Sequence, residues 1–199
     1  MSQEHREASE SWQQFEERPT VVLVSETAIF SLVMVLSLFG NLLVCYAVYK
    51  NPRLRCPCNY YIISLALTDI LQAICSMPLS VMLLGTSRWS FGTPACYFAA
   101  ITKLSLAKTS VYTMTLMALN RYYKIVKPAR FQALYKKKFI IITALLAWII
   151  PIIISLLAAF SLDQRAKPNP GYAMCILEFH QWFFPILSVI LYLPYFIIG

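Results

Sequence analysis

The sequence predicts an all-α bundle of transmembrane helices with five spans. Of its 199 residues, 59% are hydrophobic and only 13% are charged, whereas soluble domains average about 25% charged residues. Five apolar stretches are long enough to cross the hydrocarbon core of a bilayer, which takes about 20 helical residues. Each must be helical, because membrane lipid offers no hydrogen-bond partner to an exposed backbone group. The stretches cover approximately residues 23–49, 59–86, 94–126, 138–161 and 180–199.

A polar tail, residues 1–22, precedes the transmembrane domain of residues 23–199. It contains five glutamates and two arginines, and we expect it to be disordered. No basic segment followed by a short apolar core precedes a cleavage site, so we predict no cleavable signal peptide. The first apolar stretch is then expected to act as an uncleaved signal-anchor.

Basic residues lie mainly on one side of the predicted membrane. The loops after the first and third stretches, with the adjoining helix end, contain ten of them, and the opposite side contains three: Arg88, Arg165 and Lys167. Cytoplasmic loops carry the excess of Lys and Arg in multi-pass proteins. We therefore predict a plasma-membrane protein with an extracellular N-terminus. The net charge of +8 is explained by this topology, so we do not expect the protein to bind nucleic acid.

Polar residues inside the spans are candidate functional residues, because they are costly in hydrocarbon. Asn41, Asp69 and Ser110 lie in the first, second and third stretches. An unpaired buried carboxylate takes up a proton or needs a cation, and the oxygens of Asn41 and Ser110 could complete the shell of a hard cation. The alternative is a hydrogen-bonded polar contact between helices. Beyond such an ion, we expect no cofactor.

Lys103 lies within the third stretch, about 10 Å along the helix from Cys96 at 1.5 Å per residue. If Ser110 faces the bundle interior, Lys103 does too, because a helix repeats every 3.6 residues. A buried ammonium needs an acidic group from a ligand or a carboxylate such as Glu178, unless it extends to the outer water. Lys108 points about 140° away. The predicted stripe is Lys103, Ala107, Ser110, Met114, Met117 and Arg121.

The inner and outer ends of the third stretch each have a distinctive residue. Arg121, within Asn120-Arg121-Tyr122, has five hydrogen-bond donors and keeps its charge. It could hold helix ends together or release them to meet a partner; the alternative is an ordinary anchor at the lipid interface. Cys96 and Cys175 both fall on the predicted outer side, where oxidising conditions favour a disulfide.

Taken in order, several motifs resemble those of the rhodopsin-like (class A) G-protein-coupled receptors, which have seven helices. The resemblance covers nearly the whole chain after residue 25. The motifs are Gly40-Asn41, Leu65-Ala66-Leu67-Thr68-Asp69, Trp89-Ser90-Phe91-Gly92, Cys96, Asn120-Arg121-Tyr122, Ile125-Val126-Lys127-Pro128 and Trp148. Positions 41, 69, 96, 121 and 148 are 28, 27, 25 and 27 residues apart, which fits the family's register. The chain is thus expected to be a receptor truncated after its fifth span.

The resemblance implies a role for each group of site residues. Asp69, Ser110 and Asn41 would form an allosteric sodium site. Asn120-Arg121-Tyr122 would couple to a heterotrimeric G protein. Here an asparagine replaces the family's usual aspartate, which removes the carboxylate that pairs with the arginine.

The resemblance also bears on the ligand. Lys103 and Ala107 would contact it, and Lys103 occupies the position where amine receptors of the family carry an aspartate. This favours a neutral or acidic small molecule or peptide over a biogenic amine. Asn120 and the segment Asn169-Pro170-Gly171-Tyr172 are similar to melatonin-type receptors.

Two functions compete. The first is a receptor that transmits an extracellular signal to a G protein. The second is a non-signalling truncated isoform or fragment that modulates a full-length receptor, because the family's sixth-span and seventh-span motifs do not occur in the sequence. Sequencing the transcript beyond codon 199 discriminates the two. A transporter is disfavoured because no repeated halves are visible, and an enzyme because His5 and His180 are isolated.

Overall fold

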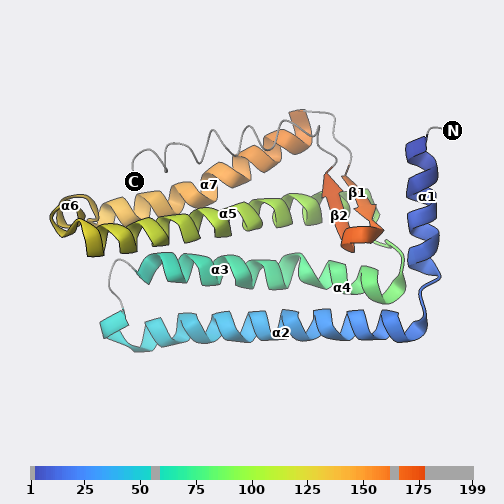
Figure 1. The fold of residues 1–199 in the computed structure, drawn as a ribbon, viewed down its shortest axis with the longest axis horizontal. Coiled ribbons are helices and arrows are strands. Elements are labelled where there is room, and N and C mark those ends of the chain that lie inside the picture. The colour runs from blue at the N-terminus through green and yellow to red at the C-terminus, as the bar shows by residue number, and fades with distance from the viewer. Residues whose placement is uncertain (1–2, 55–58, 162–165, 178–199) are drawn as a thin grey trace.

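A computed structural model describes residues 3–54, 59–161 and 166–177 of the chain. Long helices run side by side along the longest axis, and a short hairpin and the first helix lie at one end (Figure 1). The elements, in order, are α1 (Gln3–Glu16), α2 (Thr20–Lys50), η1 (Pro52–Leu54), α3 (Tyr60–Cys75), α4 (Met77–Thr86), α5 (Gly92–Val126), α6 (Pro128–Leu134), α7 (Lys137–Ser161), β1 (Ala166–Asn169), η3 (Pro170–Tyr172) and β2 (Met174–Leu177). This partial helical bundle confirms the predicted fold class.

Three helical segments of the described residues are long and apolar enough to cross a membrane. They are Thr20–Lys50, Tyr60–Thr86 and Lys137–Phe160, and they coincide with the first, second and fourth predicted stretches. α5, at 35 residues, matches the third stretch in extent but is less apolar, since it includes Lys103 and Lys108. The fifth predicted stretch, 180–199, lies outside the described residues.

Large apolar side chains cover the outer faces of these helices. On α2, Leu36, Phe39 and Leu43 are 61%, 66% and 67% exposed. On α7, Leu157 and Phe160 are 58% and 75% exposed. Contiguous apolar surface of this extent is rare on soluble monomers. The chain is therefore a multi-pass membrane protein whose exposed helix faces contact lipid.

The interior of the bundle is built from small and hydroxyl residues around α5, which packs against α3 and α7. Ala66 and Ala73 are almost fully buried on α3. Thr68 and Thr109 are fully buried and donate to the carbonyls of Ser64 and Ser105, at 2.9 Å in each case. Small residues let transmembrane helices approach closely, so this composition explains the tight contact between the helices.

The second predicted stretch is two helices, α3 and α4, separated at Ser76. Pro78 lies in the first turn of α4. Proline has no backbone N–H, and its ring clashes with the carbonyl four residues earlier in a continuous helix. The division of this stretch at Ser76 is therefore attributed to Pro78. α7 also contains a proline, Pro151, and remains one helix.

The prediction of a disordered tail is wrong for residues 3–16, which form α1. Trp12 and Phe15 lie on one side of α1, and Phe15 packs with the buried Leu83 and Leu84 of α4. Arg18 stacks over the Phe15 ring at 3.7 Å from its centroid. α1 lies across one end of the bundle (Figure 1). Composition alone predicted disorder, because it does not reveal the apolar partners that α1 finds on α4.

Arg18 anchors the segment that joins α1 to α2 by contacts with α2 and with the end of α4. Its guanidinium pairs with Glu26, and it donates to the Leu84 carbonyl at 3.4 Å and to Ser87 Oγ at 3.4 Å. A second ion pair, between Arg88 and Glu16, is more exposed. Exposed pairs contribute little, so the stacked and partly buried Arg18 is the main attachment of this end.

Candidate functional site

A disulfide fixes the hairpin to the N-terminal end of α5. Cys96 and Cys175 are joined with an S–S distance of 2.01 Å, which confirms the predicted bond. Both residues are buried, at 1% and 2% exposure, within an apolar cluster that includes Ala99 and Leu177. The bond thus holds β2 directly over α5 at the end of the bundle where α1 also lies (Figure 1).

The hairpin itself was missed by sequence reasoning. β1 and β2 are antiparallel, with Ala166 opposite Leu177 and Asn169 opposite Met174. The turn between them contains Pro170 and Gly171, and such Asn-Pro-Gly clusters mark turns. That signal was available, but strands of four residues carry too short an alternation to be recognised.

The predicted sodium-site residues come from three helices, α2, α3 and α5. Asn41 is a side-chain hydrogen-bond partner of Asp69, and it also donates to the Ser37 carbonyl at 2.8 Å. Ser110 is half-buried, and its side chain has no hydrogen-bond partner within the described part of the chain. The structure therefore brings Asn41 and Asp69 together, and among the described residues it shows no side-chain hydrogen bond from Ser110 to either of them.

The predicted ligand residues lie on a side of α5 that the described helices leave partly open. Lys103 is half-buried and Ala107 is exposed, whereas Ser105 and Thr109, on the opposite side of the helix, are buried. Among residues 3–54, 59–161 and 166–177, Lys103 has no ion-pair partner. Its proposed partner Glu178 lies outside the described residues.

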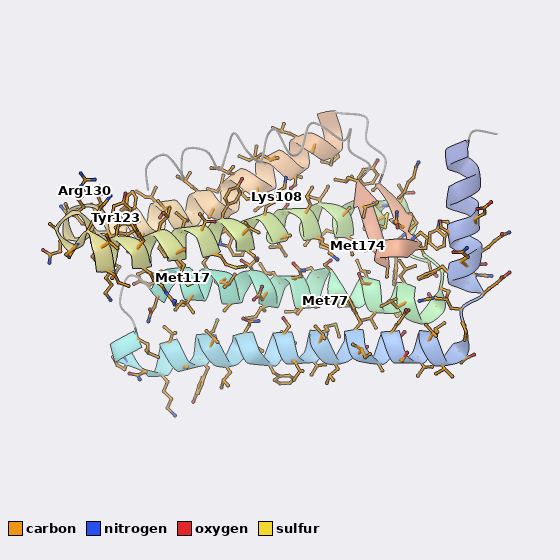
Figure 2. All side chains as sticks on the ribbon, in the orientation of Figure 1. Met77, Lys108, Met117, Tyr123, Arg130 and Met174 are labelled. Carbon is orange, nitrogen blue, oxygen red and sulfur yellow. A yellow bond between two sulfur atoms is a disulfide. The ribbon has the colours of Figure 1, made fainter. Side chains whose placement is uncertain are left out.

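Lys108 lies on another side of α5. It is half-buried, and Figure 2 shows it on the flank of α5 that faces α7. This agrees with the helical period, which directs it away from Lys103 and toward a neighbouring helix.

The triplet Asn120-Arg121-Tyr122, near the C-terminal end of α5, divides between the interior and the surface. Asn120 is 3% exposed, and its Nδ2 has no hydrogen-bond partner among the residues described. Arg121 and Tyr122 are exposed. Within the described ranges Arg121 forms no ion pair, as expected from the replacement of aspartate by Asn120. A free guanidinium at the surface can contact a partner, which a buried ion pair would prevent.

Two hydrogen bonds connect α3 with α7 inside the bundle. Trp148 Nε1 donates to Ser64 Oγ at 2.8 Å, and the hydroxyls of Tyr61 and Thr143 are 2.7 Å apart. Trp148 was identified from the sequence, but its partner was not, because the pair is 84 residues apart. These bonds fix the position of α7 along the axis of α3.

We predict a measurable coupling between Trp148 and Ser64. In a double-mutant cycle with Trp148→Phe and Ser64→Ala, the coupling free energy is expected to be about 1 kcal/mol, because bonds between membrane helices contribute about 0.6 to 1.7 kcal/mol. Thermal unfolding in detergent measures it. The exposed Thr86→Ala provides the control, paired with Trp148→Phe, and its coupling should be near zero. A zero coupling for Trp148 with Ser64 would contradict the assigned bond.

A hollow of about 460 Å³ opens between α1, α2, α4 and η3. Its lining includes Phe15, Arg18, Glu26, Phe30 and Leu84. Neither Lys103 nor Ala107 lines it. Because Arg18 and Glu26 already pair with each other, the hollow offers no free charge for a ligand.

Comparison with known proteins gives a consistent family. The model of the family "7 transmembrane receptor (rhodopsin family)" matches residues 40–199. The human histamine H2 receptor is 28% identical over 166 residues, which are 81% of this chain and 46% of that protein. The mouse 5-hydroxytryptamine receptor 1B is 32% identical over 176 residues, 87% and 44% respectively.

An insect protein, the octopamine receptor beta-2R of Chilo suppressalis, is 27% identical over 191 residues, 89% of this chain and 48% of that receptor. The chain thus spans about half the length of the curated relatives it matches. These relatives are named for amines and lend no support to the melatonin-type resemblance, which stays a prediction.

Proposed function

The chain belongs to the rhodopsin family of seven-transmembrane receptors, and from this premise we propose that its complete gene product is a G-protein-coupled receptor. An extracellular ligand would shift the bundle between two states, and a heterotrimeric G protein would respond to the difference. The observation that carries the proposal is Arg121, which lies exposed and without an ion pair among the described residues, at the inner end of α5 within the family match.

The proposal includes an orientation, with the N-terminus outside the cell. Two independent features support it. The disulfide and hairpin lie at one end of the bundle, and the basic residues of α6 and the start of α7 lie at the other (Figure 1). Disulfides persist in oxidising compartments, and excess Lys and Arg favours the cytoplasmic side.

We propose a neutral or acidic ligand that contacts Lys103 and Ala107. The relatives named above are amine receptors, but two like charges repel, so the Lys103 ammonium disfavours a cationic amine at this position. An acidic group would instead pair with it. Within the part of the chain that the structure describes, this side of α5 is partly open, which supports ligand access.

The test of this function is recruitment of Gα subunits to the receptor in cells, with libraries of carboxylates, neutral molecules, peptides and amines. We expect recruitment with at least one neutral or acidic compound, and loss of that response in Lys103→Gln. A response to amines alone would contradict the proposed ligand class. Recruitment with no compound of any class would count against the receptor function.

For the proposed sodium site, we predict that sodium stabilises the protein and that Asp69→Asn abolishes this effect. A ligand at ten times its Kd stabilises by about 1.4 kcal/mol. Melting temperatures in NaCl and in choline chloride of equal ionic strength give the measurement. Glu26→Gln, which removes a carboxylate at the outer end, should keep the sodium effect. Equal melting temperatures of the unmodified protein in the two salts would exclude the site.

A further inference from the structure

The inner end of the bundle, in the orientation proposed above, has a dense group of cations. We call it the inner-loop cluster; its members are Lys124, Lys127, Arg130, Lys136, Lys137 and Lys138. All except the half-buried Lys127 are exposed. The sequence contains no acidic residue between Asp69 and Asp163, so no carboxylate from α5, α6 or α7 neutralises the cluster.

The aromatic rings around the inner-loop cluster indicate that it lies at the membrane interface. Tyr135 contacts three rings, with centroid distances of 5.6 Å to Tyr123, 5.1 Å to Phe131 and 5.4 Å to Phe139. Lys127 Nζ lies 5.9 Å from the centre of the Tyr123 ring. Tyrosine and tryptophan concentrate where lipid headgroups meet hydrocarbon. The cations around these rings therefore lie at headgroup level.

The positions of the cluster residues along the helices also indicate that they lie at the membrane interface. α5 ends at Val126 and α7 begins at Lys137, so every member of the cluster lies within or close to the last turn of a bundle helix or in the short connection between them. Figure 2 shows Tyr123 and Arg130 at this end of the molecule, beyond the main body of α3. All six side chains can therefore contact the headgroups of one bilayer surface at the same time.

The start of α7 is electrostatically unfavourable without an anion. Lys137 and Lys138 occupy its first turn, which has no acidic residue. The N-terminus of a helix carries a partial positive charge and free N–H groups, and it favours anions over cations. The cations here therefore oppose the helix dipole. A bound phosphate would neutralise the cations and accept hydrogen bonds from the free N–H groups.

We propose that the inner-loop cluster binds the phosphorylated inositol headgroup of an inner-leaflet lipid. Clusters of four to eight Lys or Arg next to a membrane helix bind anionic lipids. Six cations within residues 124–138 match a headgroup with several phosphates better than phosphatidylserine, which has a single net charge. The assignment to the inner leaflet rests on the orientation proposed above.

The experiment uses the 199-residue chain in phosphatidylcholine nanodiscs, with empty nanodiscs as the blank. Fluorescence anisotropy follows the binding of a fluorescent dioctanoyl phosphatidylinositol bisphosphate. Lys136→Gln with Lys138→Gln is expected to weaken binding about 10- to 30-fold, from the effect of two basic residues near a charged surface. Both faces of a nanodisc are accessible, so this result does not depend on the orientation or on the receptor function.

Two matched variants control for charge and folding. Lys136→Arg with Lys138→Arg keeps the charges and should bind within about threefold of the unmodified chain, since both side chains attract phosphate. Arg88→Gln with Lys167→Gln removes two cations from the outer end and should leave binding unchanged. Formation of the Cys96–Cys175 disulfide in every variant checks the fold.

Four outcomes would overturn the proposal. The first is unchanged binding in the double glutamine variant. In the second, phosphatidylserine displaces the probe as effectively as unlabelled phosphatidylinositol bisphosphate, which would indicate general charge attraction. In the third, soluble inositol trisphosphate displaces it equally well, which would indicate a site for free phosphates. In the fourth, the double glutamine variant loses Gα recruitment in cells but keeps lipid binding, which would assign the cluster to a protein partner.

Discussion

Replacement of Cys175 by alanine is expected to lower the free energy of unfolding by about 4 kcal/mol and to reduce the amount of protein at the cell surface. The bond to Cys96 closes a loop with a sequence separation of 79 residues, and closing a loop of this size in the unfolded chain contributes about 4 kcal/mol. That is a large part of a typical total stability of about 5 to 15 kcal/mol. The hairpin over the outer end of α5 would also lose its covalent attachment. Thermal unfolding in detergent and the fraction that reaches the cell surface are the measurements.

The matched control is Cys45→Ala in α2, where the cysteine is unpaired and half-buried. It should lower the stability by no more than about 1 kcal/mol, since the change removes one sulfur from a partly exposed site. Reduction of the unmodified protein should reproduce the Cys175→Ala result. Equal melting temperatures for Cys175→Ala and Cys45→Ala would show that the disulfide does not hold the fold together.

The second large effect concerns Arg121. Arg121→Ala in the complete gene product is expected to lower ligand-dependent nucleotide exchange on Gα at least about tenfold, because hydrogen bonds to a charged group contribute about 1.5 to 3 kcal/mol. Its guanidinium is exposed and makes no ion pair inside the described part of the chain, so its loss should cost binding to the partner rather than stability. Exchange rate and melting temperature, measured together, separate the two.

Two variants sharpen this prediction. Arg121→Lys keeps the charge but not the planar fork of donors, and it should retain an intermediate exchange rate. Arg88→Ala removes an exposed arginine at the outer end, where it pairs with Glu16 at 3.2 Å, and it should not change the exchange rate. If Arg121→Ala exchanges at the unmodified rate, Arg121 does not contact the G protein.

The main helices were predictable because long apolar runs need no tertiary information. α2 and α7 begin and end close to the expected residues, and the disulfide followed from the side on which Cys96 and Cys175 fall. The division at Ser76 coincides with Pro78, which has no backbone N–H for a continuous helix, although Pro151 does not divide α7.

Other features depend on contacts that sequence periodicity does not contain. α1 forms where Phe15 meets Leu83 and Leu84, almost 70 residues later in the chain. Trp148 bonds with Ser64 through helix packing alone. The period of α5 places Lys103 and Ser110 on one stripe, but a period gives no information on which neighbours cover that stripe.

The most direct test of the account is guanine-nucleotide exchange on purified Gα by the complete gene product in nanodiscs. The account predicts that a ligand which recruits Gα in cells accelerates exchange by the unmodified protein, and that Arg121→Ala removes most of this acceleration. Recruitment in cells without any acceleration of exchange by the purified, folded protein would contradict the claim that this chain belongs to a signalling receptor.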